Sequence, residues 1–200
     1  MYRQVMDIRG WDERYRSGER TEEDLDAPPT PLVIETASGL RPGRALDLAS
    51  GTGRNALWLA RRGWEVTAVD GAPAGIDILR ARARRLGLTV NAEAADLQTS
   101  EFPIEPKSWD LIAICYYLQR DLFEPAKAGV KPSGTLLAIV HTTEAGEEPT
   151  ASRLRRGELK RYFGDWEILH HYEGASRDPA HRRPVAEIVA RRPPESKDGR

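Results

Sequence analysis

The sequence predicts an α/β fold, a three-layer sandwich in which helices cover both faces of a Rossmann-like, mostly parallel seven-stranded sheet. Two observations predict this class. Short apolar runs alternate with helical patterns from residue 45 to residue 140, as in the βαβ units that build a parallel sheet. The last two apolar runs, residues 166–172 and 185–190, are joined by a polar connector instead of a helix, which predicts a C-terminal antiparallel β-hairpin.

Residues 1–30 are predicted to form an N-terminal part of their own, a helix followed by a Pro-rich link. Ile8, Trp11 and Tyr15 recur at helical spacing and predict a helix over residues 7–17. The prolines that follow favour extended backbone and therefore predict the link.

Residues 31–192 are predicted to form one domain in which strands and helices follow one another regularly. The expected bounds of each helix and strand are taken from the glycine, proline and polar residues that lie between the apolar patterns. The expected elements are a helix over 31–40, a strand over 45–48, a helix over 55–62, a strand over 65–69, a helix over 73–86, a strand over 88–94, a strand over 109–114, a short helix over 121–128, a turn at 131–134, a strand over 135–140, a helix over 156–163 and the two hairpin strands. Residues 193–200 are Pro-rich and charged and are expected to form a disordered tail.

The composition predicts a soluble, cytoplasmic protein that is long enough to bury a sizeable core. The 200 residues carry 30 basic and 31 acidic side chains, a net charge of −1, so no global field attracts nucleic acid or an anionic membrane. The single cysteine, Cys115, excludes an internal disulfide and a multi-cysteine zinc site. No apolar run is long enough to span a bilayer, and the first residues do not resemble a signal peptide. We therefore expect no metal, no nucleic acid and no membrane partner, and a monomer or a homodimer.

A glycine turn between a strand and a helix, with a carboxylate at the end of the next strand, is the most informative pattern in the chain. The strand that ends at Leu48 runs into Gly51 and Gly53, where the missing Cβ atoms allow a sharp turn and the close approach of a ligand. The first turn of the following helix offers unpaired N–H groups to an anionic group. Asp70, at the end of the second strand, is placed to accept hydrogen bonds from a ribose diol. The pattern predicts a site for an adenosine-containing ligand.

Two further carboxylates favour S-adenosylmethionine over NAD. Asp47, four residues before Gly51, would repel a pyrophosphate but would attract the ammonium and sulfonium groups of S-adenosylmethionine. Asp96, at the end of the third strand, either accepts a hydrogen bond from the adenine amino group or caps the strand. The glycine pattern, with Ala56 at its third position, also fits a dinucleotide fingerprint. A NAD-dependent oxidoreductase is therefore the alternative, and it predicts tolerance of Asp47→Ala.

The same segments resemble those of a known superfamily. Residues 45–60 and 63–71 resemble motifs I and II of the class I S-adenosylmethionine-dependent methyltransferases. Within that superfamily the chain is most similar to the tellurite-resistance/thiopurine-methyltransferase-like branch, whose leading helix resembles residues 11–18. Two departures are visible, because Ser50 stands where a cysteine or glycine is common and residues 131–134 replace the usual Pro-Gly-Gly. Both are changes between small residues in turns.

The resemblance implies S-adenosylmethionine as the cofactor and a set of residues around it. The leading helix would cover the cofactor with Trp11 and Tyr15, although simple packing of that helix on the sheet explains these aromatics equally well. The residues assigned to the cofactor are Trp11, Tyr15, Asp47, Ser50, Gly51, Gly53, Asp70, Gly71, Asp96, Leu97 and Cys115.

Tyr116 and His141 are the candidates for a catalytic role, since they follow the fourth and fifth strands at the edge where ligands bind in open α/β sheets. The resemblance makes Cys115 and Tyr116 neighbours of the reactive methyl group. Cys115 is not expected to be a nucleophile, because methyl transfer needs no covalent enzyme intermediate. His141 is a general base, a substrate contact or a polar cap of its strand. Four arginines either gather at the pocket mouth and attract an anionic acceptor, or are solvated or form salt bridges: Arg120, Arg153, Arg155 and Arg156.

The functional hypothesis is a methyltransferase that passes the methyl group of S-adenosylmethionine to a small nucleophile, such as a thiol or a chalcogen oxyanion, by in-line displacement. Two alternatives stay open, the NAD-dependent oxidoreductase and a non-catalytic regulator that binds S-adenosylmethionine. Titration with S-adenosylmethionine and NAD distinguishes the methyltransferase from the oxidoreductase. Turnover on a panel of acceptors distinguishes the methyltransferase from the regulator.

Overall fold

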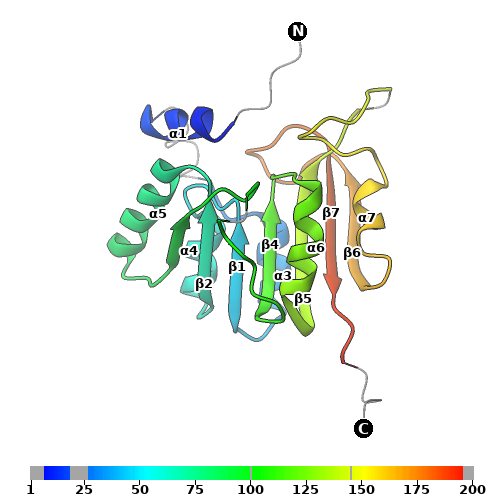
Figure 1. Cartoon of the computed structure of the whole chain (residues 1–200), viewed down its shortest axis with the longest axis horizontal. Coiled ribbons are helices and arrows are strands. Elements are labelled where there is room, and N and C mark those ends of the chain that lie inside the picture. The colour runs from blue at the N-terminus through cyan, green and yellow to red at the C-terminus, as the bar shows by residue number, and fades with distance from the viewer. Residues whose placement is uncertain (1–6, 19–26, 100, 145, 196–200) are drawn as a thin grey trace.

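The computed structural model describes residues 7–18, 27–99, 101–144 and 146–195, and this part of the chain contains one seven-stranded sheet (Figure 1). The strand order is β3-β2-β1-β4-β5-β7-β6. The first five strands in this order are parallel, and β7 pairs antiparallel with both β5 and β6. The strands are β1 (Arg44–Leu48), β2 (Glu65–Asp70), β3 (Asn91–Ala94), β4 (Trp109–Cys115), β5 (Val130–His141), β6 (Glu167–Gly174) and β7 (Val185–Arg191). The predicted fold class, including the C-terminal antiparallel hairpin, is confirmed.

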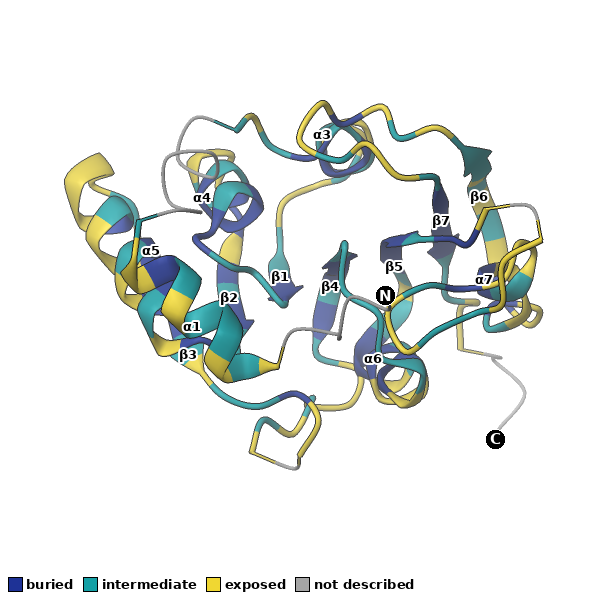
Figure 2. Ribbon diagram, turned by 90° about the horizontal axis from the view of Figure 1, so that it is seen from above, coloured by how far each residue is buried: buried dark blue, intermediate teal, exposed yellow. Residues whose placement is uncertain are grey.

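Helices cover both faces of the sheet, as Figure 2 shows from above. On one face lie α3 (Pro31–Ser38), α4 (Arg54–Arg61) and α5 (Pro73–Leu86), and on the other lie α6 (Phe123–Gly129) and α7 (Glu158–Arg161). Helix α1 (Ile8–Arg16) packs on α5. Its first turn is capped by Asp7, whose side chain accepts a hydrogen bond from the Gly10 N–H.

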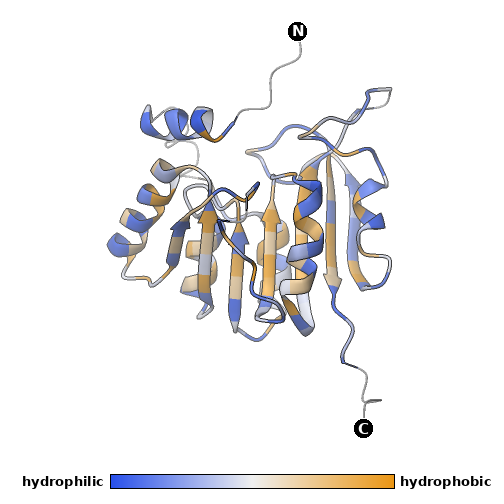
Figure 3. Cartoon of the chain, viewed as in Figure 1, coloured by the Kyte–Doolittle hydropathy of each residue, from blue (hydrophilic) through white to orange (hydrophobic). Residues whose placement is uncertain are grey.

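The alternation of side chains along each strand divides the core in two. On β1, Ala45 belongs to the apolar cluster under α3, α4 and α5, whereas Leu46 and Leu48 belong to the cluster under α6 and α7. The central strands are accordingly apolar and the outer helix surfaces hydrophilic (Figure 3). Because both faces are covered, a ligand reaches the sheet at its strand ends.

The structure corrects two predicted boundaries near glycine residues. The third strand was expected over 88–94 but begins at Asn91, because the Leu88 N–H still donates to the Ala83 carbonyl and so closes the end of α5. The helix expected over 156–163 is limited to Glu158–Arg161, since Gly157 has a left-handed φ of 77° directly before it. The tail expected over 193–200 is described only to residue 195, and residues 19–26 of the predicted link also lie outside the described residues.

The prediction of a turn at residues 131–134 is wrong. These residues belong to β5, which pairs with β4 through Val130 and again from Thr135 onward, with an irregularity between. Within it Ser133 has a φ of 64° and donates its N–H to the Arg192 carbonyl. The segment is therefore a bulge inside a longer strand.

Across the described residues, no helix combines the length and the apolar character that crossing a lipid bilayer requires.

Candidate functional site

The carboxyl ends of β1, β2, β4 and β5 meet at one edge of the sheet, and the turn after β1 forms the centre of that edge (Figure 1). Gly51 and Gly53 have left-handed φ angles of 55° and 83°. The turn is held by hydrogen bonds from the Ser50 N–H to the Val69 carbonyl and from the Gly53 N–H to the Ser50 carbonyl. Helix α4 begins directly afterwards at Arg54, so its first N–H groups point to the same edge.

Asp70 ties this glycine turn to the end of β2. One carboxylate oxygen accepts a hydrogen bond from the Gly51 N–H at 2.8 Å, and the other accepts one from the Ala72 N–H at 2.8 Å. Each carboxylate oxygen can accept more than one hydrogen bond. The structure thus places Asp70 beside the turn, as expected, and its contact with a ribose stays a prediction.

Asp47 is a buried carboxylate in the middle of the site. Its side chain is 1% exposed, and among the described residues its Oδ2 has no hydrogen-bond partner. Burial raises the pKa of Asp47 to about 7, against the opposing effects of the Ala56 backbone and the Arg54 charge. An unpaired buried acceptor of this kind is costly, and an ammonium group would satisfy it. The hydroxyl of Ser50 is likewise buried without a partner among the described residues.

Helix α1 lies directly on the glycine residues of the site. The Tyr15 hydroxyl would be 2.8 Å from a Cβ atom at Gly51, and the Ile8 side chain would be 2.9 Å from one at Gly71. Asp12 accepts a hydrogen bond from the Ala74 N–H at 2.7 Å, in the first turn of α5. The ring of Trp11 stacks on that of Tyr15 with a centroid distance of 6.1 Å. The helix is thus placed against the site, and whether it covers a cofactor stays a prediction.

Asp96 and Leu97 lie at the same edge, after β3. Asp96 Oδ1 accepts a hydrogen bond from the Gln98 N–H at 2.8 Å, as a turn-capping residue does. Leu97 is buried, and its carbonyl accepts a hydrogen bond from Gln119 Nε2 at 2.9 Å. The capping role of Asp96 is therefore visible, and its contact with adenine stays a prediction.

Tyr116 and His141 come together at the ends of β4 and β5. Their ring centroids are 5.5 Å apart, and Tyr116 has a left-handed φ of 60°, which is strained for a side chain of this size. Burial lowers the pKa of His141, with Arg183 and Arg153 acting in the same direction and the Pro184 backbone opposing it. His141 Nδ1 is buried without a hydrogen-bond partner among the described residues. Burial raises the pKa of the neighbouring Cys115, which favours the protonated thiol, and the expectation that it is not a nucleophile stays a prediction.

Three site residues were not found from the sequence. Arg54 forms an ion pair with Asp178 at 2.7 Å, and the ring of His181 stacks on Tyr116. Asp178 and His181 belong to the loop between β6 and β7, and Asp178 is 124 residues from Arg54 along the chain. The position of Arg54 directly after the glycine turn is the one signal in the sequence. No spacing pattern connects it to a carboxylate so far away.

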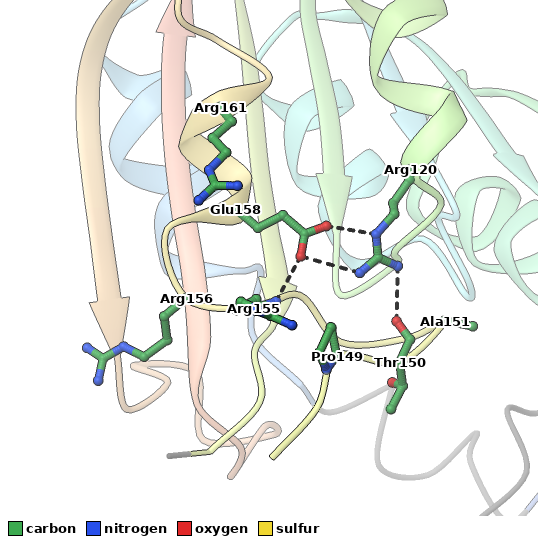
Figure 4. A pocket seen from close by; sticks show the side chains of 8 residues that line it. All are labelled: Arg120, Pro149, Thr150, Ala151, Arg155, Arg156, Glu158 and Arg161. Atoms are coloured by element: carbon green, nitrogen blue, oxygen red, sulfur yellow. Dashed lines mark hydrogen bonds and ion pairs between the residues drawn. The ribbon is translucent and has the colours of Figure 1, made fainter. Parts of the chain in front are cut away.

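Three of the predicted arginines, Arg120, Arg155 and Arg156, line a separate cavity of about 560 Å³ beside α7 (Figure 4). Arg120 binds Glu158 at 2.7 Å and donates to the Thr150 carbonyl at 3.0 Å. Arg153, Arg155 and Arg156 pair with Glu147, Glu148 and Glu173. The salt-bridge interpretation of these arginines is therefore confirmed. Within the described residues no group of histidine, cysteine and carboxylate side chains is arranged to hold a metal.

The strand order, the glycine turn after β1 and the carboxylates at the ends of β1 and β2 define a class I S-adenosylmethionine-dependent methyltransferase fold. The chain belongs to the family of the tellurite resistance protein TehB, whose family model matches residues 27–181. The resemblance seen in the sequence is confirmed.

Curated relatives match one region of this chain. Hemagglutinin 1 of Eikenella corrodens is 28% identical over an alignment of 152 residues, and the match covers 70% of this chain and 49% of the relative. A probable S-adenosyl-L-methionine-dependent methyltransferase TehB of Haemophilus influenzae (strain ATCC 51907 / DSM 11121 / KW20 / Rd) is 25% identical over an alignment of 151 residues, and the match covers 70% of this chain and 52% of the relative. The chain thus spans about half the length of these relatives.

Solved structures share the fold. TehB from Haemophilus influenzae aligns with a TM-score of 0.69 at 24% identity, over 80% of this chain and 61% of that chain. The 1,6-didemethyltoxoflavin-N1-methyltransferase of Burkholderia thailandensis, solved with S-adenosylhomocysteine, aligns with a TM-score of 0.68 at 19% identity, over 93% of this chain and 87% of that chain. The [4+2]-cyclase SpnF has a TM-score of 0.66 at 23% identity, over 82% of this chain and 79% of that chain. At these identities the likeness concerns the fold.

Proposed function

We propose that this chain binds S-adenosylmethionine at the glycine turn and transfers its methyl group to a small nucleophile. The observation that carries the proposal is the buried Oδ2 of Asp47, which lacks a partner among the described residues and lies beside a turn that glycines keep open. A cationic ligand satisfies that carboxylate, whereas a pyrophosphate is repelled by it. The membership of the TehB family supports the same cofactor.

The residues of the chain bind and orient rather than react covalently. Asp47 holds the ammonium group, Asp70 and Gly51 hold the ribose side, and the first turn of α4 receives the carboxylate group. When bound, S-adenosylmethionine supplies an electrophilic methyl group on a sulfonium. Alignment of the acceptor behind that methyl group, away from water, can contribute roughly 7–11 kcal/mol to the barrier reduction.

The acceptor we propose is a soft nucleophile such as a thiol or a chalcogen oxyanion. The name of the family supports the second class. The chemistry of the acceptor supports the first, because a thiol loses its proton readily and becomes a strong nucleophile. We further propose a cytoplasmic protein, a monomer or a homodimer, that acts on small molecules and not on nucleic acid or at a membrane.

Calorimetric titration with S-adenosylmethionine, S-adenosylhomocysteine and NAD in parallel tests the cofactor. We expect binding of the first two and none of NAD. Asp70→Ala removes the carboxylate oxygens that accept hydrogen bonds from the Gly51 and Ala72 N–H groups. It should weaken S-adenosylhomocysteine binding about tenfold or more, since two charge-assisted bonds are lost. Asp77→Ala, on the exposed side of α5, is the matched control. Binding of NAD alone would support the oxidoreductase, and binding without turnover on a panel of thiols and tellurite would support the regulator.

His141 is proposed as the base that receives the acceptor proton. Because its pKa is lowered, the ring stays neutral at pH 7 and its Nδ1 can accept a proton. His141→Gln should lower kcat roughly 10²-fold for a protonated acceptor. The wild-type rate should also fall when the pH drops below the lowered pKa of His141, because the ring is then protonated. The rate of His141→Gln should not show this fall.

The pH profile of His141→Gln is compared with the wild type on the same acceptor, so the titration of the acceptor is common to both. His171→Gln on β6 serves as the control. Identical profiles in wild type and His141→Gln would leave His141 as a polar cap of its strand.

A further inference from the structure

A buried ion pair joins the glycine turn to the loop between β6 and β7. Arg54, the first residue of α4, contacts Asp178 at 2.7 Å, and the two side chains are 13% and 1% exposed. Burial alone would raise the pKa of Asp178, but the hydrogen bond and charge of Arg54 hold it below its ordinary value. Two charges this deeply buried are costly to leave unpaired, so each fixes the other's position.

Asp178 also organises its own loop. Its Oδ1 accepts a hydrogen bond from the Ala180 N–H at 3.0 Å, and its carbonyl accepts one from the His181 N–H at 3.0 Å. The loop therefore turns around Asp178 and brings the ring of His181 onto Tyr116, with centroids 3.3 Å apart and planes 5° apart. Figure 1 shows this loop reaching from the β6–β7 hairpin across the upper edge of the sheet towards β4.

The same end of α4 also holds the segment before α3. Arg54 Nη1 donates to the Pro28 carbonyl at 3.2 Å, and Asn55 Oδ1 accepts a hydrogen bond from the Thr30 N–H at 2.9 Å. Two successive residues after the glycine turn thus fix two segments that are distant in sequence. One of them, the β6–β7 loop, contacts the two candidate catalytic rings through His181, whose centroid is 5.3 Å from that of His141.

We infer that Arg54 and Asp178 are positioning residues that hold the β6–β7 loop, residues 175–184, as the acceptor-side wall of the methyl-transfer site. The inference rests on the proposed function, because it makes the loop a part of the acceptor pocket. The glycine turn binds the cofactor, and the ion pair fixes the loop relative to that turn. Loss of the pair should release His181 from Tyr116 and impair acceptor binding far more than cofactor binding.

Limited trypsin digestion reports on the loop directly. The bond between Arg182 and Arg183 is a trypsin site inside it, and Asp178→Asn should increase cleavage there about tenfold or more. Binding of S-adenosylhomocysteine, measured by calorimetry, should change less than about threefold, whereas KM for 2-mercaptoethanol or tellurite should rise about tenfold or more. Arg54→Lys keeps the positive charge opposite Asp178. This variant should therefore retain much of the wild-type resistance to cleavage and much of the wild-type KM. Glu167→Gln, which breaks the exposed pair with Arg191 in the same hairpin, is the control.

A second variant separates positioning from general stability. Arg54→Met combined with Asp178→Leu removes both charges without leaving one unpaired, so the fold should persist. The loop should still be cleaved faster in this variant. Unchanged cleavage in both variants, or equal losses of cofactor and acceptor binding in Asp178→Asn, would overturn the inference. The cleavage result does not depend on any acceptor, so a failure of the proposed reaction would leave it standing.

Discussion

Replacement of Asp47 by asparagine is expected to weaken S-adenosylmethionine binding by about 10³-fold, equivalent to about 4 kcal/mol. The carboxylate is 1% exposed, and its Oδ2 has no partner among the described residues. The ammonium group of the cofactor would therefore lose a buried opposite charge, not a solvated one. Calorimetric titration of wild type and variant measures the ratio. NAD binding, were it present, would not suffer from this change.

The raised pKa of Asp47 also predicts a pH dependence of stability. The pKa of Asp47 is about 7 in the folded state and 3.8 for an ordinary aspartate, so between about pH 4 and pH 7 the folded state holds a proton that the unfolded state has released. The free energy of unfolding should therefore fall as pH rises through this window, by about 4 kcal/mol in total from this group. Asp47→Asn lacks the group and should lack this slope. Denaturant unfolding of both proteins at pH 5, 6 and 7 gives the difference directly.

Cofactor binding should consequently release a proton below pH 7. An ammonium group favours the ionised form of Asp47, so the carboxyl must lose its proton when the cofactor binds. Titration at pH 6 in buffers of different ionisation enthalpy measures that proton, and Asp47→Asn should not release it. Equal proton release in wild type and variant would assign it to another group and remove Asp47 from the ammonium site.

The local patterns of the sequence predicted the elements that depend on near neighbours. The positions of Gly51 and Gly53 predicted a turn between a strand and a helix, and both residues have the left-handed φ that makes glycine necessary there. The apolar spacing of Ile8, Trp11 and Tyr15 predicted α1 to within a residue at each end. In these places the local preference and the fold agree.

The features that the sequence could not show depend on contacts between distant residues. The bulge at Ser133 includes a hydrogen bond to the Arg192 carbonyl, and the loop that carries His181 is joined to α4 by the ion pair of Arg54 with Asp178. The charge of Asp47 indicated a cationic ligand, but its burial follows from packing on both faces of β1. Such side chains are placed by tertiary structure, which no local spacing encodes.

Gly53→Ala is expected to destabilise the fold by about 3 kcal/mol, lowering Tm by about 9 °C. Two costs combine at this position. Gly53 has a φ of 83°, which costs an L-residue roughly 1 kcal/mol, and a Cβ atom there would overlap Leu79 Cδ1 and lie 2.8 Å from Leu79 Cγ. Leu79 is fully buried in the core cluster under α4 and α5, so its side chain has little room to move away.

Gly63 provides the control for the backbone cost alone. Its φ is 87°, nearly that of Gly53, but a Cβ atom there would meet no atom of the described structure within 4 Å. Gly63→Ala should therefore cost only about 1 kcal/mol. In a double-mutant cycle, Leu79→Ala should reduce the cost of Gly53→Ala to about that same value, because the overlapping methyl group is gone. If both alanine variants were equally stable, the contact of Leu79 with the glycine turn would not constrain residue 53, and α5 would not be what keeps this turn free of side chains.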